Sequence, residues 1–201
     1  MSKTNKRPRY VTPAGIAQYP YLTTPDTKFN PDGDYKVNLE IDPTEITTFL
    51  DEQHEAAVAA AKKENPGKKI KEGDVPYSVN EETGKVTVRF KLKAKVHPKN
   101  GESFDQRPAL FDAKGKPLGK DVKIGGGSKI KVSYEVLPYY TAIAGAGISL
   151  RLKAVQVIDL VEYSSGGSGE SYGFGKEEGY EATEEPTNDF TDESQAETHD
   201  F

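Results

Sequence analysis

Residues 85–97 read Lys85-Val86-Thr87-Val88-Arg89-Phe90-Lys91-Leu92-Lys93-Ala94-Lys95-Val96-His97, a stretch in which apolar and polar residues alternate without a break. This alternation predicts a β-strand with one face in a hydrophobic core and the other in solvent. The solvent face is almost purely cationic and includes Arg89, Lys91, Lys93 and Lys95. On a strand these side chains recur at about 6.6 Å, twice the rise per residue, which is comparable with the phosphate spacing of an extended single-stranded nucleic acid.

Four like charges in line repel one another, whereas an ordinary solvated strand face usually mixes charges of both signs. We therefore interpret this face as a surface that follows the backbone of an external polyanion, in preference to a plain solvated face. Lys129 and Lys131 extend the same pattern onto another alternating stretch, which follows Gly125-Gly126-Gly127-Ser128. This glycine-rich stretch is either a turn that enters the strand or a backbone contact for phosphate.

Other stretches with alternating apolar and polar residues lie on both sides of residues 85–97 in the sequence. Strands are predicted at residues 35–41, 130–137 and 148–161, with a weaker one at 109–112. The inward residues of the last strand change parity near Ala154, which predicts a β-bulge and suits a small closing barrel. Residues 1–30 show no sustained periodicity and are predicted to form an irregular arm.

One helix is predicted between these strands. Asp42-Pro43-Thr44-Glu45 provides an N-cap residue, a proline at the first helical position and a glutamate three residues after the cap. Asn65-Pro66-Gly67 ends the helix. The sequence thus predicts a mainly β fold with one inserted α-helix, in a body that spans residues 1–163.

The charge of the chain is divided unevenly about a formal net value of −5. Residues 164–201 hold eleven acidic residues and one basic residue, so they carry −10, whereas residues 1–163 hold 26 basic and 21 acidic residues and carry +5. Residues 164–201 are too poor in apolar side chains to form a core, which predicts a disordered acidic tail. A basic body joined to an acidic tail is expected when the body binds a polyanion and the tail competes for the same surface. A purely solubilising tail is the alternative.

Signatures of catalysis, metals and cofactors are missing. The chain has no cysteine, and its histidines, His54, His97 and His199, have no metal-ligand spacing and are each expected to be solvated. The glycine-rich stretch lacks the Gly-Lys-Ser/Thr order of a nucleotide-binding loop. We therefore expect no enzyme activity, no cofactor and no metal.

Membrane and export signals are missing as well. A membrane span needs about 18 apolar residues, and no apolar run in the sequence approaches this length. The basic N-terminus lacks the apolar segment of a signal peptide. We expect a cytosolic protein with no membrane partner.

Sequence-tolerant binding of single strands also needs aromatic platforms, on each of which a base can stack for about 1 to 3 kcal/mol. Tyr139 and Tyr140 follow Pro138, where two adjacent side chains cannot both point inward. Tyr77 also follows a proline. These tyrosines are candidates for stacking, and the alternative is that they cap the end of the barrel.

Several short motifs occur in a fixed order along the chain. They are Gly15-Ile16-Ala17-Gln18-Tyr19-Pro20-Tyr21 with Pro25-Asp26, Gly33-Asp34-Tyr35-Lys36-Val37-Asn38-Leu39, Glu72-Gly73-Asp74-Val75-Pro76, Phe90-Lys91-Leu92-Lys93, Ile124-Gly125-Gly126-Gly127-Ser128-Lys129-Ile130-Lys131-Val132 and Leu137-Pro138-Tyr139. An acidic tail that ends in Asp200-Phe201 follows them. In these motifs and their order, the sequence resembles the T-seven-type phage single-stranded DNA-binding proteins over nearly the whole body.

The resemblance implies an OB fold, a five-stranded barrel whose open face takes single-stranded DNA. It implies backbone contacts at Lys91, Lys93, Lys129 and Lys131, a contact from Lys3 in the arm, and stacking at Tyr139. It also implies a role in phage DNA replication, recombination and repair in the cytoplasm of an infected bacterium, with Asp200 and Phe201 recruiting the phage DNA polymerase and helicase-primase. A homodimer is left open.

Two departures from the family pattern stand out. Asp32 replaces an arginine before the Gly-x-Tyr-Lys-Val strand, and the family's tryptophan is missing near Tyr140 and Thr141. The share of affinity that each contact supplies is therefore expected to differ.

Two other functions compete with single-strand binding. An architectural protein could set the same basic face against duplex phosphates, and comparison of single strands with matched duplexes separates the two readings. A nuclease could use carboxylates such as Asp105 and Asp112, and incubation of labelled DNA with magnesium tests this, with no cleavage expected.

Overall fold

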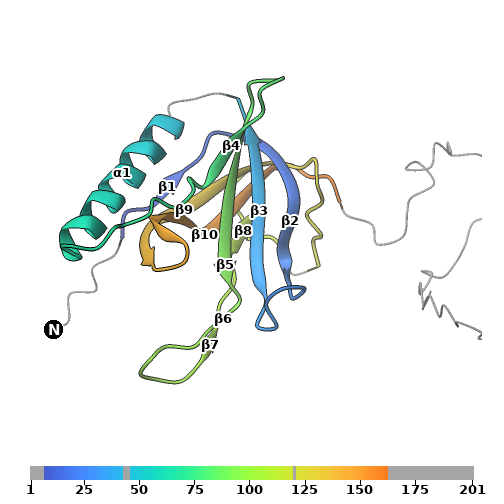
Figure 1. The fold of residues 1–201 in the computed structure, drawn as a ribbon. Coiled ribbons are helices and arrows are strands. Elements are labelled where there is room, and N and C mark those ends of the chain that lie inside the picture. Colours follow the sequence, from blue (N-terminus) through green and yellow to red (C-terminus); the bar gives the residue numbers. More distant parts are fainter. Residues whose placement is uncertain (1–6, 43–45, 120, 163–201) are drawn as a thin grey trace, which may run out of the picture. The chain divides into compact units, whose positions relative to one another are not determined.

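A computed structural model describes residues 7–42, 46–119 and 121–162. Five strands form a closed ring: β2 (Gly15–Asp26), β3 (Asp34–Ile41), β5 (Val86–Lys93), β10 (Gly145–Asp159) and β9 (Lys129–Thr141), with β9 pairing back to β2. All of these pairings are antiparallel except that of β5 with β10. This closed five-stranded barrel is the predicted OB architecture (Figure 1).

Shorter strands decorate the barrel. They are β1 (Tyr10–Val11) beside β9, β4 (Tyr77–Val79) beside β5, and β8 (Ala109–Phe111) beside β10. A separate hairpin, β6 (Lys95–Val96) with β7 (Phe104–Asp105), continues from β5 and extends beyond the end of the barrel (Figure 1).

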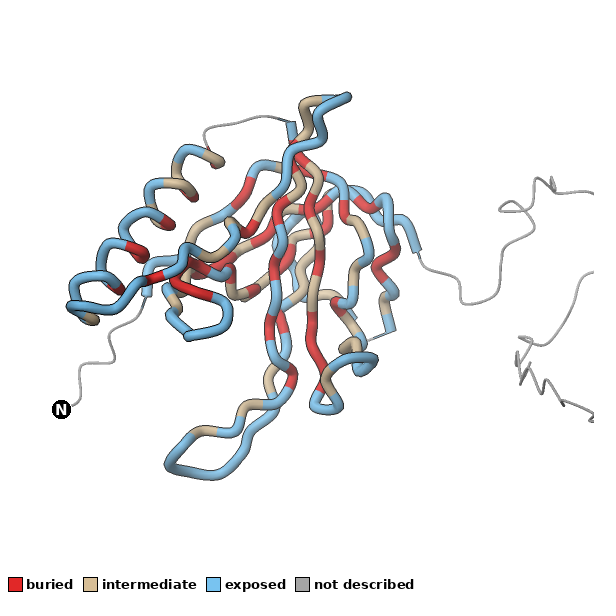
Figure 2. The backbone as a smooth tube through the Cα atoms, in the orientation of Figure 1, coloured by how far each residue is buried: buried red, intermediate tan, exposed pale blue. Residues whose placement is uncertain are grey.

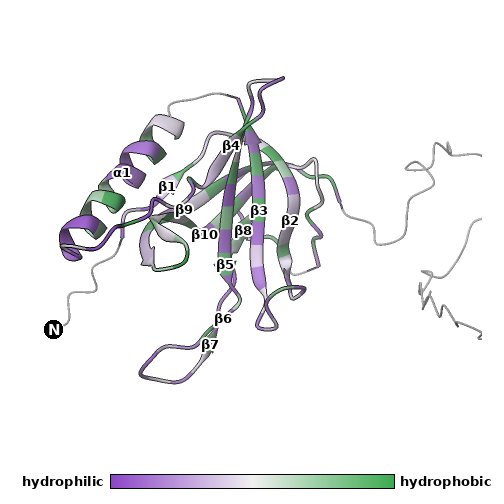
Figure 3. Cartoon of the chain, in the orientation of Figure 1, coloured by the Kyte–Doolittle hydropathy of each residue, from purple (hydrophilic) through white to green (hydrophobic). Residues whose placement is uncertain are grey.

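The core lies inside the barrel and is built by the alternation seen in the sequence. On β5, Val88, Phe90 and Leu92 are buried, while the residues between them face outward. Figure 2 shows buried and less buried positions alternating along the strands, and Figure 3 shows the matching alternation of hydropathy along β3 and β5. The bulge predicted near Ala154 is confirmed by a register shift between Leu152 and Ala154.

The predicted helix is α1 (Ile46–Glu64), which packs on β9 and β10. Its end before Asn65-Pro66-Gly67 is confirmed, and Gly67 has a φ of 81°. The expectation that His54 is solvated is wrong, because this residue lies on the inner face of α1 among its buried apolar side chains. No helix in the described ranges is long and apolar enough to cross a membrane.

Three predictions of strand boundaries need correction. Residues 1–30 are not all irregular, because β2 occupies positions 15–26 and is a full member of the barrel. The stretch 85–97 is divided between β5 and β6 at Ala94, whose backbone amide donates to the carbonyl of Gly33. The strand predicted to end at Leu137 continues to Thr141, because residues 137–141 pair with the start of β10.

Tyr134 provides a test of the core that depends on pH. Its ring lies inside the barrel, with centroids 5.2 Å from Phe90 and 5.8 Å from Tyr10. Burial, with a smaller contribution from repulsion by Tyr10, raises the pKa of Tyr134 to about 12. A tyrosine in the unfolded chain has a pKa of about 10.

The folded state therefore holds this proton more tightly, so the stabilisation is present below pH 10 and is lost as the pH rises towards about 12. We expect the free energy of unfolding to fall by about 1 to 2 kcal/mol over this window. Urea denaturation of the parent and of Tyr134→Phe measures this, and the variant should lose less stability. An identical loss in both proteins would assign the effect to other groups.

Candidate nucleic-acid interface

Three cations stand side by side on the outside of the barrel, each on a different strand. Lys36 of β3 is in register with Lys91 of β5, which is in register with Arg151 of β10. Neighbouring strands lie about 4.8 Å apart, so the three side chains form a band that crosses the strands. We call Lys36, Lys91 and Arg151 the cationic row.

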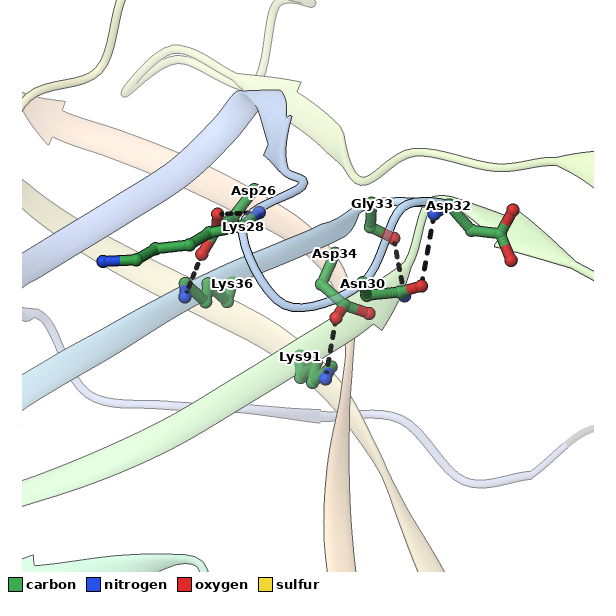
Figure 4. A network of polar contacts seen from close by, with 8 residues as sticks. All are labelled: Asp26, Lys28, Asn30, Asp32, Gly33, Asp34, Lys36 and Lys91. Atoms are coloured by element: carbon green, nitrogen blue, oxygen red, sulfur yellow. Dashed lines mark hydrogen bonds and ion pairs between the residues drawn. The ribbon is translucent and has the colours of Figure 1, made fainter.

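A carboxylate holds each member of the cationic row. Lys91 Nζ lies 2.8 Å from Asp34 Oδ2, Lys36 pairs with Asp26, and Arg151 lies 3.6 Å from Glu135 (Figure 4 shows the first two pairs). The acids are mostly covered, with side-chain exposures of 9% to 11%, whereas their cationic partners are 37% to 61% exposed. This arrangement holds the cations in place while their side chains stay partly exposed to an approaching anion.

Two of these acids, Asp26 and Asp34, differ in how their carboxylate oxygens are hydrogen-bonded. The pKa of Asp26 is lowered because its carboxylate accepts hydrogen bonds from the Lys36 ammonium and then from the Lys28 backbone amide. One oxygen of Asp34, Oδ1, is buried without a hydrogen-bond partner among the described residues. Asp34 therefore carries buried negative charge directly beside the cationic row.

The residues predicted along β5 do not share one environment. Lys93 is exposed on β5, and Lys95 is exposed on the β6–β7 hairpin, and within the described ranges neither ammonium group makes an ion pair or hydrogen bond. Arg89 is exposed, but its guanidinium donates to the carbonyl of Val75 at 2.8 Å and to that of Tyr77 at 3.5 Å. Arg89 thus also fastens the segment that leads into β4.

Lys129 and Lys131 lie on the outward side of β9, away from the cationic row. Lys129 is in register with Ile16 of β2, and Ile16 with Glu40 of β3, which faces Thr87. Thr87 precedes Lys91 by four residues on β5, so the strand positions in register with Lys129 lie apart from the cationic row. The ammonium groups of Lys129 and Lys131 have no ion-pair partner in the part of the chain that the structure describes.

The glycine-rich stretch before Lys129 is a closed turn. The amides of Gly125, Gly127 and Ser128 donate to the carbonyls of Val161, Ala17 and Gly125. The Ser128 hydroxyl is fully buried and bonds within the same turn and to Val161. Three amides are therefore already used, which favours the interpretation as a turn.

The candidate stacking tyrosines differ in their hydrogen bonds and in how far they are exposed. Tyr77 donates a hydrogen bond to Asp51 of α1 at 2.8 Å, and burial is the main cause of the raised pKa of its hydroxyl. Tyr139 is half-buried, and its hydroxyl packs against Gly73 and Gly147, so closely that a Cβ added at either glycine would lie no more than 3.0 Å from it. Tyr140 is 38% exposed. The stacking role stays a prediction, and of the three Tyr140 has the most accessible ring.

The carboxylates named for a nuclease do not come together as a site. Asp112 accepts hydrogen bonds from the backbone amides of Lys114 and Lys116, each at 2.8 Å, and so shapes a turn. Asp105 lies on β7, opposite Lys95. Among the described residues, no group of three or more His, Asp or Glu side chains could hold a metal ion.

Lys3, Asp200 and Phe201 lie outside the described residues, as does the tail. Sequence reasoning missed Lys36 and Arg151, although the same alternation places both on the outer face of their strands. The ion pairs with Asp34 and Glu135 had no signal in the sequence, because they depend on the three-dimensional pairing of strands.

The chain is similar to known phage proteins in sequence. A profile of the family described as single-stranded DNA-binding protein of bacteriophage T7 matches residues 14–160. The single-stranded DNA-binding protein of Enterobacteria phage T3 is 35% identical over 205 residues, which cover 89% of this chain and 88% of that protein. Its counterpart in Escherichia phage T7 is 36% identical over 183 residues, which cover 78% of each chain.

Solved structures agree with the profile. The crystal structure of gp2.5, a single-stranded DNA-binding protein encoded by bacteriophage T7, has a TM-score of 0.68 and 32% identity, covering 77% of this chain and 93% of that one. The single-stranded DNA-binding protein from bacteriophage Enc34, in complex with single-stranded DNA, shares the fold with a TM-score of 0.54 at 19% identity, covering 77% and 88%. The chain belongs to the T7-type family of phage single-stranded DNA-binding proteins.

Proposed function

We propose that this protein binds single-stranded DNA without sequence preference, with the strand lying across the outer face of β3 and β5. The observation that carries the proposal is the cationic row, in which Lys36, Lys91 and Arg151 are register neighbours on three adjacent strands. OB barrels use the face of their second and third strands for single-stranded nucleic acid, and here these strands are β3 and β5. Relatives that are 35% and 36% identical are named single-stranded DNA-binding proteins, which supports the same ligand.

Binding in this proposal is an electrostatic event with no chemical step. The ammonium and guanidinium groups of the row, with exposed Lys93, neutralise phosphates and release their counterions. Phosphates are the same in every nucleotide, so these contacts position the strand without reading its sequence. If three to five phosphates are neutralised, the logarithm of the binding constant falls against the logarithm of salt concentration with a slope of about −2 to −3.5.

The test is a titration of fluorescent oligo-dT and of a matched duplex at several salt concentrations. The proposal expects tight binding of the single strand, weaker binding of the duplex and the slope given above. A slope near zero would contradict phosphate neutralisation. Equal or tighter binding of the duplex would favour the architectural alternative, in which the same basic face contacts double-stranded phosphates.

The wider role is part of the same proposal. We infer that the protein coats single strands during phage DNA replication, recombination and repair in the cytoplasm of the infected host. The acidic segment 164–201 recruits the phage DNA polymerase and helicase-primase through Asp200 and Phe201. Family membership and the sequence of this segment, which carries −10 and ends in phenylalanine, support this role. A homodimer is compatible with it and is tested by sedimentation.

The acidic segment gives a prediction with two separable outcomes. A tether keeps it at an effective concentration of order millimolar near the body, so deletion of residues 169–201 should raise affinity for single strands about two- to tenfold at low salt. Phe201→Ala should leave DNA affinity almost unchanged and weaken polymerase binding. Fluorescence anisotropy and a polymerase pull-down measure the two effects. The recruitment role fails if polymerase binding survives both changes.

A further inference from the structure

A bulge in β2 turns two neighbouring tyrosines onto the outside of the barrel. Between the register pairs Gln18 with Asn38 and Tyr21 with Lys36, β2 has two residues where β3 has one. Strict alternation from buried Ala17 would point Tyr19 and Tyr21 inward. The extra residue changes the parity, so that Tyr21 faces solvent and Leu22 enters the core with 2% exposure.

The backbone at this bulge is strained. Tyr19 has a φ of 49° and is the one non-glycine residue with a positive φ in the described ranges. A residue with a Cβ is disfavoured in this left-handed region, and such outliers concentrate where function maintains them. Glycine, the residue that adopts this conformation freely, is not used here.

Neither ring serves the core. Tyr19 is 75% exposed and Tyr21 is 41% exposed, and neither belongs to the hydrophobic core. Neither hydroxyl has a hydrogen-bond partner among the described residues. The Tyr19 ring, and the part of the Tyr21 ring that Lys36 does not cover, are therefore available to a ligand.

The position of the pair identifies the kind of ligand. Lys36 Nζ lies 5.0 Å from the centre of the Tyr21 ring, and Lys36 begins the cationic row. Tyr21, Lys36, Lys91 and Arg151 are thus successive register neighbours on β2, β3, β5 and β10. A nucleotide presents a flat base beside an anionic phosphate, and this line presents an aromatic ring beside cations.

We propose that Tyr19 and Tyr21 form a base-stacking platform at the β2 end of the cationic row, and that the β2 bulge exists to aim it. The inference rests on the proposed single-strand binding and adds the residues that contact bases. The cations hold the backbone, while the two rings stack on bases of any identity. Pro20, between the rings, restricts the backbone and limits the freedom lost on binding.

The variants separate the rings from the strain in the backbone. Tyr19→Gly removes the ring and also relieves the positive φ, so its melting temperature should be no lower than that of the parent. Tyr21→Ala removes the second ring. Tyr19→Phe and Tyr21→Phe keep the aromatic faces and should bind as the parent does. Val79→Ala, at a residue 53% exposed on β4, is the control for loss of surface apolar area.

The experiment compares oligo-dT with an abasic oligomer of the same length at one salt concentration. The parent should prefer oligo-dT. Tyr19→Gly and Tyr21→Ala should each lose about 5- to 100-fold of affinity for oligo-dT, with affinity for the abasic strand and the salt slope unchanged.

The possible results distinguish the two proposals. If the parent binds oligo-dT and both variants bind it equally well, the platform is wrong and single-strand binding stands. Equal losses on oligo-dT and the abasic strand would also overturn the platform, because the tyrosines would then act only by placing Lys36. If the parent binds neither strand, the proposed function itself fails.

Discussion

Replacing Lys91 and Lys93 together by glutamine should weaken binding of single-stranded DNA about 100-fold at about 0.05 M salt, equally for every base sequence. Each phosphate contact on a single strand contributes about 0.7 to the salt slope, which corresponds to about tenfold in affinity at this salt concentration. The slope should therefore become shallower by about 1.4, and the difference should shrink as salt is added. Glutamine keeps most of each side chain's length, so the effect reports charge. Fluorescence anisotropy with oligo-dT and mixed-sequence strands measures both quantities.

The matched control is Lys62→Gln with Lys63→Gln. It changes the net charge by the same amount at the end of α1, where Lys62 pairs with Glu72 at 3.1 Å. This control should bind DNA almost as the parent does. If both double variants lose the same affinity, net charge and not the β3–β5 face governs binding. Losses that depend on base sequence would show that Lys91 and Lys93 read bases.

Asp34→Asn should tighten binding about 5- to 10-fold at low salt. The Asp34 carboxylate lies 2.8 Å from Lys91 Nζ and competes with phosphate for this cation. Removing one negative charge about 6 Å from a phosphate at a partly screened surface is worth about 1 kcal/mol. The gain should decrease as salt rises. Stability should change little, because the loss of the ion pair with the exposed Lys91 is offset by removal of charge from a buried group, one of whose oxygens lacks a hydrogen-bond partner.

Glu72→Gln is the control for Asp34→Asn, because it removes the same charge from an ion pair with Lys62 beside α1. It should leave affinity within about twofold of the parent, since exposed pairs remote from the ligand are screened. Weaker binding by Asp34→Asn, with an unchanged melting temperature, would mean that Asp34 acts by positioning Lys91. In that case the competition described here is wrong.

The parts of the fold that local alternation encodes could be predicted from the sequence. The decisive stretch 85–97 buries alternate side chains, and the change of parity near Ala154 is a bulge. β2 escaped prediction because the bulge at Tyr19 and Pro20 interrupts its period. His54 was misjudged because a polar residue at a buried helix position has no local signal that separates it from a solvated one.

The cations were visible in the sequence, but their arrangement was not. Alternation places Lys91 on an outer face, whereas its alignment with Lys36 and Arg151 follows from strand register. Arg89 looked equivalent to Lys91, yet pairing of β4 with β5 brings the Val75 carbonyl to its guanidinium. Long-range pairing of this kind is set by the whole core, and no single stretch contains it.

The most direct test of the account is lysine footprinting on the intact protein. Acetylation of each lysine is measured by mass spectrometry with and without saturating oligo-dT. We expect DNA to protect Lys36, Lys91 and Lys93, while Lys62 and Lys63 on α1 react as before in the same sample. Equal protection of both groups, or protection of the α1 lysines alone, would contradict the placement of single-stranded DNA on the β3–β5 face.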